Sequence, residues 1–421
     1  MSSPELKHSP LEQLHIDVLG AQLTDFGGWQ MPLRYTSDLD EHRAVRTSAG
    51  VFDLSHMGEI RVRGRQAGEA LDHALAGHLS KVPEGRAKYT MLLDPEGGIL
   101  DDLVVYHMPG GDYLVVANAA NTATDVAELT ERASGFDAEV LDETEDTALI
   151  AVQGPQAVDV VGNALSASNL DPEEIESLPY YWCRFGKFQG DAFLLARTGY
   201  TGEDGYELYV PWAAAERLWR RLRQATDFNL IPCGLASRDT LRLEAGMPLY
   251  GHELSTAVKP SQAGLGRVVS FKKDCDFVGR SALEGRDGSS DRVLVGLAGE
   301  GRRAARAGYP VLDAGGATVG EVTSGVLSPP SAIPWRWPTS TRAAPRREPR
   351  STSTSAARRS RTPSSRCPST SGPEARPNID PGRSHGTDRS EVLERTRVGG
   401  PRSGHRSRDR RHHGLRRRAA R

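Results

Sequence analysis

The chain has 421 residues, a formal net charge of -2 and four cysteines. Its length suggests two or three domains. No apolar run approaches the ~20 residues of a membrane span, and the N-terminus lacks the apolar core of a signal peptide. The four scattered cysteines form no CxxC pair, so we expect no metal site and no disulfide framework. We therefore expect a cytoplasmic protein that does not bind a membrane.

The small net charge is the sum of a basic C-terminal part and an acidic remainder of the chain. Residues 331–421 contain 23 arginines, no lysine and seven acidic residues, which leaves 30 basic and 48 acidic residues for the rest. From residue 338 onward the chain is mostly Arg, Ser, Thr, Pro, Gly and Ala, and it has too few large apolar side chains to bury a core. We therefore expect residues 329–421 to be a disordered tail.

The first part of the chain mixes helices and strands. A turn-rich segment, 24–32, precedes a helix over 38–48, and 51–64 reads as a strand pair or as one strand with a bend. The expected elements that follow are an amphipathic helix over 67–79, strands over 88–93, 99–106 and 113–118, and a helix over 121–133. This order favours an α+β unit with an antiparallel sheet.

The second part of the chain continues in the same way. The expected elements are a strand over 147–155, a helix over 157–164, a hairpin over 192–210, helices over 212–225 and 236–245, and short strands over 293–297, 309–312 and 318–325. Arg238 and Arg242 are four residues apart and share one helix face. The last three strands indicate a small β-domain.

A glycine-rich loop joins the two strands of the expected hairpin. The loop and the start of its second strand, Arg197–Glu207, contain three glycines, which suit a backbone that needs positive φ or close approach to a ligand. In the second strand Tyr206, Leu208 and Val210 take one face, and Glu207 and Tyr209 take the other. The pattern is compatible with a surface hairpin that has a solvated acidic tip, or with a carboxylate and phenols that face a site.

Two adjacent aspartates, Asp101 and Asp102, interrupt an otherwise apolar strand. Alternation groups Asp102 with Val104 and Tyr106, and it puts Asp101 on the opposite face. A buried carboxylate is costly without partners. The pair is either a solvated strand start or includes a carboxylate whose pKa or orientation is tuned for reaction with an amine.

Six segments, in this order, resemble the aminomethyltransferase (T-protein) family of the glycine cleavage system. The resemblance covers roughly residues 10–328, and each block alone is weak. The blocks are 25–32, 52–58, 97–103, 153–155, 199–207 and 236–246.

The resemblance implies a fold of α+β class, a three-domain cloverleaf of antiparallel sheets with flanking helices around a central folate cavity. The implied first domain is discontinuous, 1–50 plus 147–270, and the second is 51–146. The third, over 280–328, is β-barrel-like and incomplete.

The resemblance also assigns roles to residues of this chain. Asp102 matches the aspartate near the reacting folate nitrogen and is the catalytic candidate, preferred to Asp101, which is kept as a binding residue. Glu207 matches the pterin-binding glutamate, and Arg238 matches an arginine at the folate site. The remaining matched binding positions are Met57, Tyr89, Val116, Asn118 and Tyr200.

The implied activity transfers the methylene of an aminomethyl group on the lipoyl arm of H-protein to tetrahydrofolate, with release of ammonia. Lipoylated H-protein is the expected partner, and a monomer that does not bind nucleic acid is expected. Two alternatives are a demethylase-type folate module, which would carry a flavin domain, and a non-enzymatic folate-binding relative. The latter family has a Lys-Gly-Cys-Tyr-x-Gly-Gln-Glu motif, whereas Lys259–Gly266 contains no cysteine.

After Ser328 the chain departs from the family, which continues with a strand resembling Pro-Ile-Ala-Met-Ala-Tyr-Val. Moving the reading frame by one base, within the permitted codons, turns residues 332–341 into Gly-His-Pro-Met-Ala-Met-Ala-Tyr-Val-Asp. We therefore expect residues from about 329 onward to be a frameshift product whose third domain lacks strands, with weakened or absent activity. The alternative is a genuine basic tail that binds nucleic acid.

Overall fold

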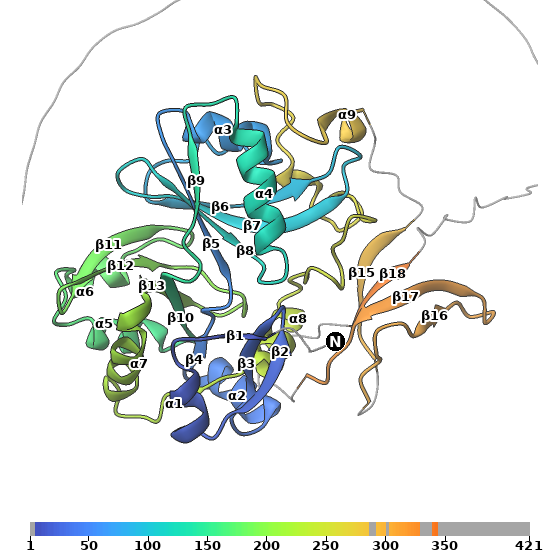
Figure 1. Cartoon of the computed structure of the whole chain (residues 1–421). Helices are drawn as coiled ribbons and strands as arrows, with labels where there is room; N and C mark the ends of the chain where they lie inside the picture. Colours follow the sequence, from blue (N-terminus) through green and yellow to red (C-terminus); the bar gives the residue numbers. More distant parts are fainter. Residues whose placement is uncertain (1–4, 286–291, 300–302, 329–338, 344–421) are drawn as a thin grey trace, which may run out of the picture. The chain divides into compact units, whose positions relative to one another are not determined.

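The structure is a computed structural model, which describes residues 5–285, 292–299, 303–328 and 339–343. In these ranges the chain is a mixed α+β fold of several sheets with flanking helices (Figure 1). No helix of the described ranges is long and apolar enough to cross a membrane. The helices are α1 (Glu12–Asp17), α2 (Asp38–Thr47), α3 (Ala67–Ala74), α4 (Thr122–Ala133), α5 (Ala157–Ala164), α6 (Pro172–Glu176), α7 (Ala215–Gln224), α8 (Leu235–Glu244) and α9 (Arg280–Leu283), with 3₁₀ turns η1 (Trp212–Ala214) and η2 (Gly266–Val268).

A six-stranded sheet carries the expected hairpin. Its strands are β4 (Gly50–Asp53), β10 (Thr147–Gln153), β11 (Cys183–Phe188), β12 (Asp191–Ala196), β13 (Gly205–Pro211) and β14 (Ile231–Pro232). Their order is β11-β12-β13-β10-β4-β14, with β14 and β4 parallel and the other neighbours antiparallel. The antiparallel pairing of β12 with β13 confirms the hairpin.

Alternation along β10 separates the two faces of this sheet. Ile150 and Val152 pack on one side with Val160 of α5 and Trp219 of α7. Leu149 faces the other side, in a second cluster. This is the period of two that an extended strand imposes, and it leaves one face of the sheet free to meet another sheet.

A five-stranded antiparallel sheet lies against that second face. Its strands are β5 (Gly58–Arg63), β6 (Arg86–Leu93), β7 (Ile99–His107), β8 (Tyr113–Ala117) and β9 (Glu139–Asp142), in the order β6-β7-β8-β5-β9. Leu71 of α3 and Leu129 of α4 cover its outer face (Figure 1). Tyr106 and Val116, on its inner face, join Tyr209 in the cluster between the two sheets.

Two smaller sheets complete the described fold. One contains β1 (Lys7–His8), β2 (Gln22–Phe26) and β3 (Trp29–Arg34) in the order β1-β3-β2. The other contains β15 (Val293–Leu297), β16 (Pro310–Leu312), β17 (Thr318–Ser324) and β18 (Thr339–Ala343) in the order β15-β18-β17-β16. In the last sheet Val322 is the only hydrophobic residue that is buried within the described residues 292–328.

Several contacts cross the expected domain bounds, which stay predictions. β4, which begins at Gly50, pairs with β10. Leu254 and Phe277 pack with Met91 and Ile99 of the five-stranded sheet. β18 pairs with β15 and β17 beyond residue 328, because both strands offer backbone groups that need partners. The rest of the expected tail lies outside the described residues.

We expect two glycine-to-alanine changes to have opposite effects on stability. A Cβ on Gly234, the N-cap of α8, would lie 2.3 Å from the backbone oxygen of Leu33. Because backbone moves only at a cost, Gly234→Ala should destabilise by about 1–3 kcal/mol. Gly162, inside α5, has open space around an added Cβ, so Gly162→Ala should stabilise by about 0.5–1 kcal/mol. Denaturant unfolding measures both, and shifts of equal sign would contradict this reading.

Candidate active site

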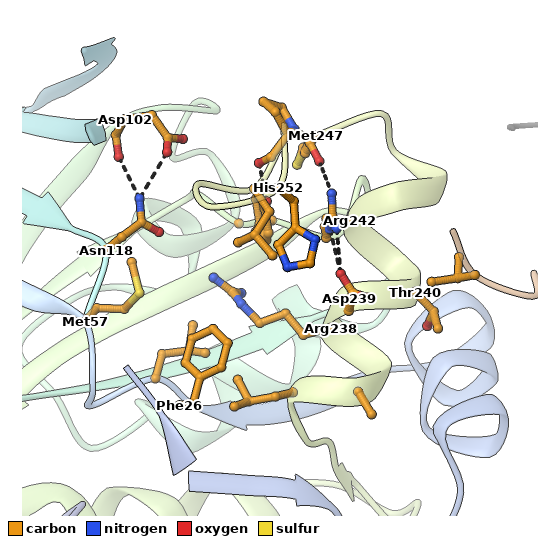
Figure 2. A pocket seen from close by; sticks show the side chains of 18 of the residues that line it. Phe26, Met57, Asp102, Asn118, Arg238, Asp239, Thr240, Arg242, Met247 and His252 are labelled. Atoms are coloured by element: carbon orange, nitrogen blue, oxygen red, sulfur yellow. Dashed lines mark hydrogen bonds and ion pairs between the residues drawn. The ribbon is translucent and has the colours of Figure 1, made fainter. Parts of the chain in front are cut away.

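A pocket of about 1210 Å³ is lined by residues of both larger sheets, of α8 and of the segment that follows it (Figure 2). Leu149, Val116 and Tyr209 belong both to its lining and to the cluster between the sheets. The predicted site residues that line it are Met57, Tyr89, Asp102, Val116, Asn118, Tyr200, Glu207 and Arg238. The pocket therefore gathers side chains that are far apart in the sequence.

Asp102 is held at one side of the pocket by two hydrogen bonds from neighbouring strands. Its Oδ2 accepts from the Tyr89 hydroxyl at 2.9 Å, and its Oδ1 accepts from the Asn118 amide at 3.0 Å. Figure 2 shows Asn118 also donating to the Asp102 backbone oxygen. Burial, together with the charge on Asp101, raises the pKa of Asp102 to about 7. A half-buried carboxyl with this pKa can hold or release a proton near neutral pH.

Asp101 lies outside the pocket, contrary to the expectation that it contacts the ligand. Its side chain is fully buried, and it accepts hydrogen bonds from the backbone N–H of Asn118 at 3.0 Å and from the amides of Asn118 and Asn121 at 2.8 and 2.7 Å. Strand alternation turns it toward the helix-covered face of the sheet, as it turns Leu103. Asp101 is therefore a buried, hydrogen-bonded carboxylate behind the site.

Glu207 presents one carboxylate oxygen to the pocket and uses the other internally. Oε2 accepts from the Thr198 hydroxyl at 2.5 Å and from the Tyr106 hydroxyl at 3.2 Å, and Tyr209 donates to the Tyr106 oxygen at 3.2 Å. No donor within the described ranges bonds to Oε1. Because Oε2 is fixed, the remaining oxygen can accept from a ligand without reorganisation.

Arg238 brings a positive charge to the pocket and forms no ion pair in the described part of the chain. Its guanidinium lies over the ring of Tyr200, 4.8 Å from the centroid, and Figure 2 shows it pointing into the pocket. Burial lowers its pKa, and Glu207 opposes this shift. Arg242, by contrast, is buried and ion-paired with Asp239 and Glu253. Arg238 is therefore the arginine that is free to meet a polar or anionic ligand.

The walls between the polar groups are flat and largely apolar. Met57, Tyr89, Val116 and Tyr200 all line the pocket, and the Tyr200 hydroxyl donates to the backbone oxygen of Pro248, which fixes its ring. Aromatic and thioether side chains suit the faces of a planar ring system.

The sequence analysis missed three polar residues of this region. Thr198 and Tyr106 orient Glu207, and the alternation of β7 could have found Tyr106, because it shares a face with Asp102. His56 lines the pocket, and its buried Nδ1 has no partner within the described residues. Burial and the charge of Arg238 together lower the pKa of His56 to about 4, so His56 is neutral at pH 7.

The described residues contain no group of three or more His, Cys, Asp or Glu that could hold a metal ion. Cys183 and Cys233 are buried free thiols, and burial raises the pKa of each. The polar side chains that line the pocket carry carboxyl, hydroxyl, amide, imidazole and guanidinium groups.

Residues 13–273 match the family model described as GCVT N-terminal domain, which places the chain in the GCVT class. The chain is 64% identical to an aminomethyltransferase of Cutibacterium acnes over 326 residues, which are 77% of this chain and 87% of that protein. It is 54% identical to one of Streptomyces avermitilis over 334 residues, 78% of this chain and 88% of that protein.

A solved structure agrees with these sequences. The crystal structure of glycine cleavage system aminomethyltransferase T from Bartonella henselae has a TM-score of 0.73, is 35% identical, and covers 80% of this chain and 90% of that chain. The chain belongs to the aminomethyltransferase family of the glycine cleavage system.

Proposed function

We propose that the chain transfers the methylene of an aminomethyl group, carried on the lipoyl arm of H-protein, to tetrahydrofolate, with release of ammonia. The observation that carries this proposal is that Asp102 and Glu207, from different sheets, line one pocket with aromatic walls. The pocket's volume of about 1210 Å³ leaves room for both a folate and a thioether arm. In this proposal the pocket is the central folate cavity of a three-domain cloverleaf.

The two polar sides of the pocket suit different parts of a reduced folate. A pterin has adjacent N–H donors on one edge, and the free oxygen of Glu207 is an acceptor for them. The uncompensated guanidinium of Arg238 suits a carbonyl or carboxylate of the same ligand. Met57, Tyr89, Val116, Asn118 and Tyr200 wall the ring system, whereas Asp101 acts behind the site. Tetrahydrofolate is a substrate in this scheme.

Asp102 is the proposed catalytic residue. Its ionised form orients the folate amine and stabilises positive charge as the sulfur–carbon bond breaks. Tyr89 and Asn118 hold the carboxylate while this happens, which limits the reorganisation that the reaction requires. The proposal also includes lipoylated H-protein as the partner, a monomeric state and a cytoplasmic location.

The assay that tests the function is tetrahydrofolate-dependent ammonia release from aminomethylated H-protein by the full chain. Turnover in the presence of folate and none in its absence supports the proposal. Folate binding without ammonia release would instead favour the non-enzymatic folate-binding relative, whose pocket needs no group poised near neutral pH.

The ammonia-release rate should rise with pH and reach half its maximum near pH 7. The pKa of Asp102 is raised to about 7 by burial and by Asp101, and the ionised carboxylate is the proposed active form. Acidic pH therefore removes activity by protonating it. A profile of kcat from pH 5.5 to 9, compared with the same profile of Asp102→Asn, checks this. A wild-type profile that is flat across this range contradicts it.

Restoring the family reading frame after residue 328 should raise both stability and activity. The sheet of β15 to β18 has one buried hydrophobic side chain in the described residues 292–328, and Tyr309, Leu312 and Leu327 are exposed. A restored strand with Met, Ala, Tyr and Val would cover part of this surface and contribute about 3 kcal/mol or more. Thermal unfolding and ammonia release of the two chains measure this, and equal values would contradict the expected loss of stability and activity. Resequencing the locus tests the frameshift itself.

A further inference from the structure

A buried acid that the proposed mechanism does not use lies behind the active site. Asp125, in the first turn of α4, is fully buried. Neither of its carboxyl oxygens accepts a hydrogen bond from any donor of the described residues. A buried ionised carboxylate without donors is strongly unfavourable, so this group is stable only as a carboxylic acid that donates its own proton.

The acceptor for that proton is Asp101. The two carboxyl groups lie close enough to share a hydrogen bond once one of them is protonated, and Asp101 already takes three N–H bonds from Asn118 and Asn121. Burial raises the pKa of Asp101 and those donors oppose this shift by favouring its charged form, whereas Asp125 has no such donor. Burial and the charge of Asp101 raise the pKa of Asp125 to about 10. The helix N-terminus favours an ionised Asp125, but this effect is smaller than the cost of desolvation.

Asn118 connects this acid pair to the pocket. Asp101 and Asp125 lie on the helix-covered side of the five-stranded sheet, and Asp102 lies on the pocket side. The Asn118 amide nitrogen contacts Oδ1 of Asp101 at 2.8 Å and Oδ1 of Asp102 at 3.0 Å. The position of Asp101 therefore sets the position of the amide that holds Asp102.

We propose that Asp125 is a positioning residue, which holds one proton against Asp101 and thereby keeps Asp101 ionised and Asp102 aimed into the pocket. The part of this inference that concerns catalysis rests on the function proposed above, whereas the location of the proton does not. Other titratable groups interact electrostatically with Asp101, Asp102 or Asp125. They are Tyr89, Glu128, Tyr181, Tyr200 and Tyr250.

The first test measures the proton without any substrate. In the wild type, Asp125 stays protonated in the folded chain and ionises on unfolding above about pH 4, so rising pH destabilises the folded state until Asp125 itself titrates. Asp125→Asn keeps an N–H donor but does not titrate. Its Tm relative to wild type should therefore rise by about 2 °C per pH unit between pH 5 and 9.

Glu131→Gln is the matched control, because it removes an exposed carboxyl from the same helix, α4. Its Tm difference from wild type should not grow across this range. A pH-independent difference for Asp125→Asn would overturn the proposal, since it would mean that Asp125 is ionised in the folded chain.

The second test measures ammonia release by the full-length variants. Asp125→Asn should keep kcat within about twofold of wild type, because its amide can donate to Asp101 in place of the acid. Asp125→Leu removes the donor and should lower kcat by about tenfold with little change in KM for tetrahydrofolate. Without the donor, Asp101 binds a proton more readily and then no longer carries the charge that raises the pKa of Asp102. The acid limb of the kcat profile should therefore move to lower pH.

A folded Asp125→Leu chain with wild-type kcat and pH profile overturns the proposal, and so does an Asp125→Asn variant as slow as Asp125→Leu. If Asp125→Leu does not fold, the Asp125→Asn measurements decide the question alone. If the wild type releases no ammonia, the proposed function fails, while the Tm measurements still locate the proton.

Discussion

Asp102→Asn should lower kcat for ammonia release by about 10²–10³-fold and leave the dissociation constant for tetrahydrofolate within about threefold of wild type. The amide oxygen can still accept from Tyr89, so the side chain should stay in place. What the variant loses is the negative charge that stabilises the developing positive charge, an interaction made in the transition state. Steady-state kinetics and equilibrium folate binding measure the two quantities separately.

The folding of this variant can be checked independently of its activity. Since burial disfavours the charged carboxylate, the neutral amide should be no less stable than wild type above pH 7. Asp159→Asn, an exposed change on α5, is the control and should retain wild-type kinetics. Unchanged turnover in Asp102→Asn would show that the wrong aspartate was chosen. A folded Asp101→Asn variant that turns over more slowly than Asp102→Asn would show the same.

Glu207→Gln should weaken tetrahydrofolate binding by about 10–100-fold and change kcat much less. Oε2 is already bonded to Thr198 and Tyr106, so the ligand depends on Oε1 alone. In the amide, either the internal donors or the ligand meets an NH₂ group in place of an oxygen. Titration of the folate against the purified chain gives the dissociation constant.

A graded variant and a control accompany this prediction. Thr198→Val removes one donor to Oε2 and should weaken binding by about 3–10-fold, because Glu207 is then held less firmly. Glu173→Gln, on the exposed surface of α6, should leave binding unchanged. Wild-type affinity in Glu207→Gln would exclude this carboxylate as the pterin contact.

Local sequence patterns were enough to place most elements. The expected helix over 38–48 is α2, and the expected strand over 99–106 is β7. The expected helix over 67–79 is an exception, since α3 ends at Ala74. Leu75 takes an extended conformation there and forms a bridge with Leu92, a contact made by the sheet and invisible to helical periodicity.

The expected hairpin was also placed correctly, and the positive φ expected of its glycines occurs at Gly202. Gly202 has a φ of +77°, and a Cβ on Gly199 would lie 2.0 Å from the side-chain oxygen of Gln153. The bidentate pairing of Arg197 with Asp204, which closes the loop, was not anticipated. Opposite charges seven residues apart in a loop gave no signal in the sequence, because loop geometry decides whether they meet.

By itself, the sequence determined the family, the type of most elements and the fact that Asp101 and Asp102 point to opposite faces, because strand alternation is a local property of the backbone. Only the tertiary structure decided which face of the sheet meets the pocket and which face is covered by α4. The segments that pack on each face lie elsewhere in the sequence. It also supplied Thr198 and Tyr106 as partners of Glu207, and Asp125 as the partner of Asp101. Burial sets the pKa of these acids, and burial is a property of the assembled fold.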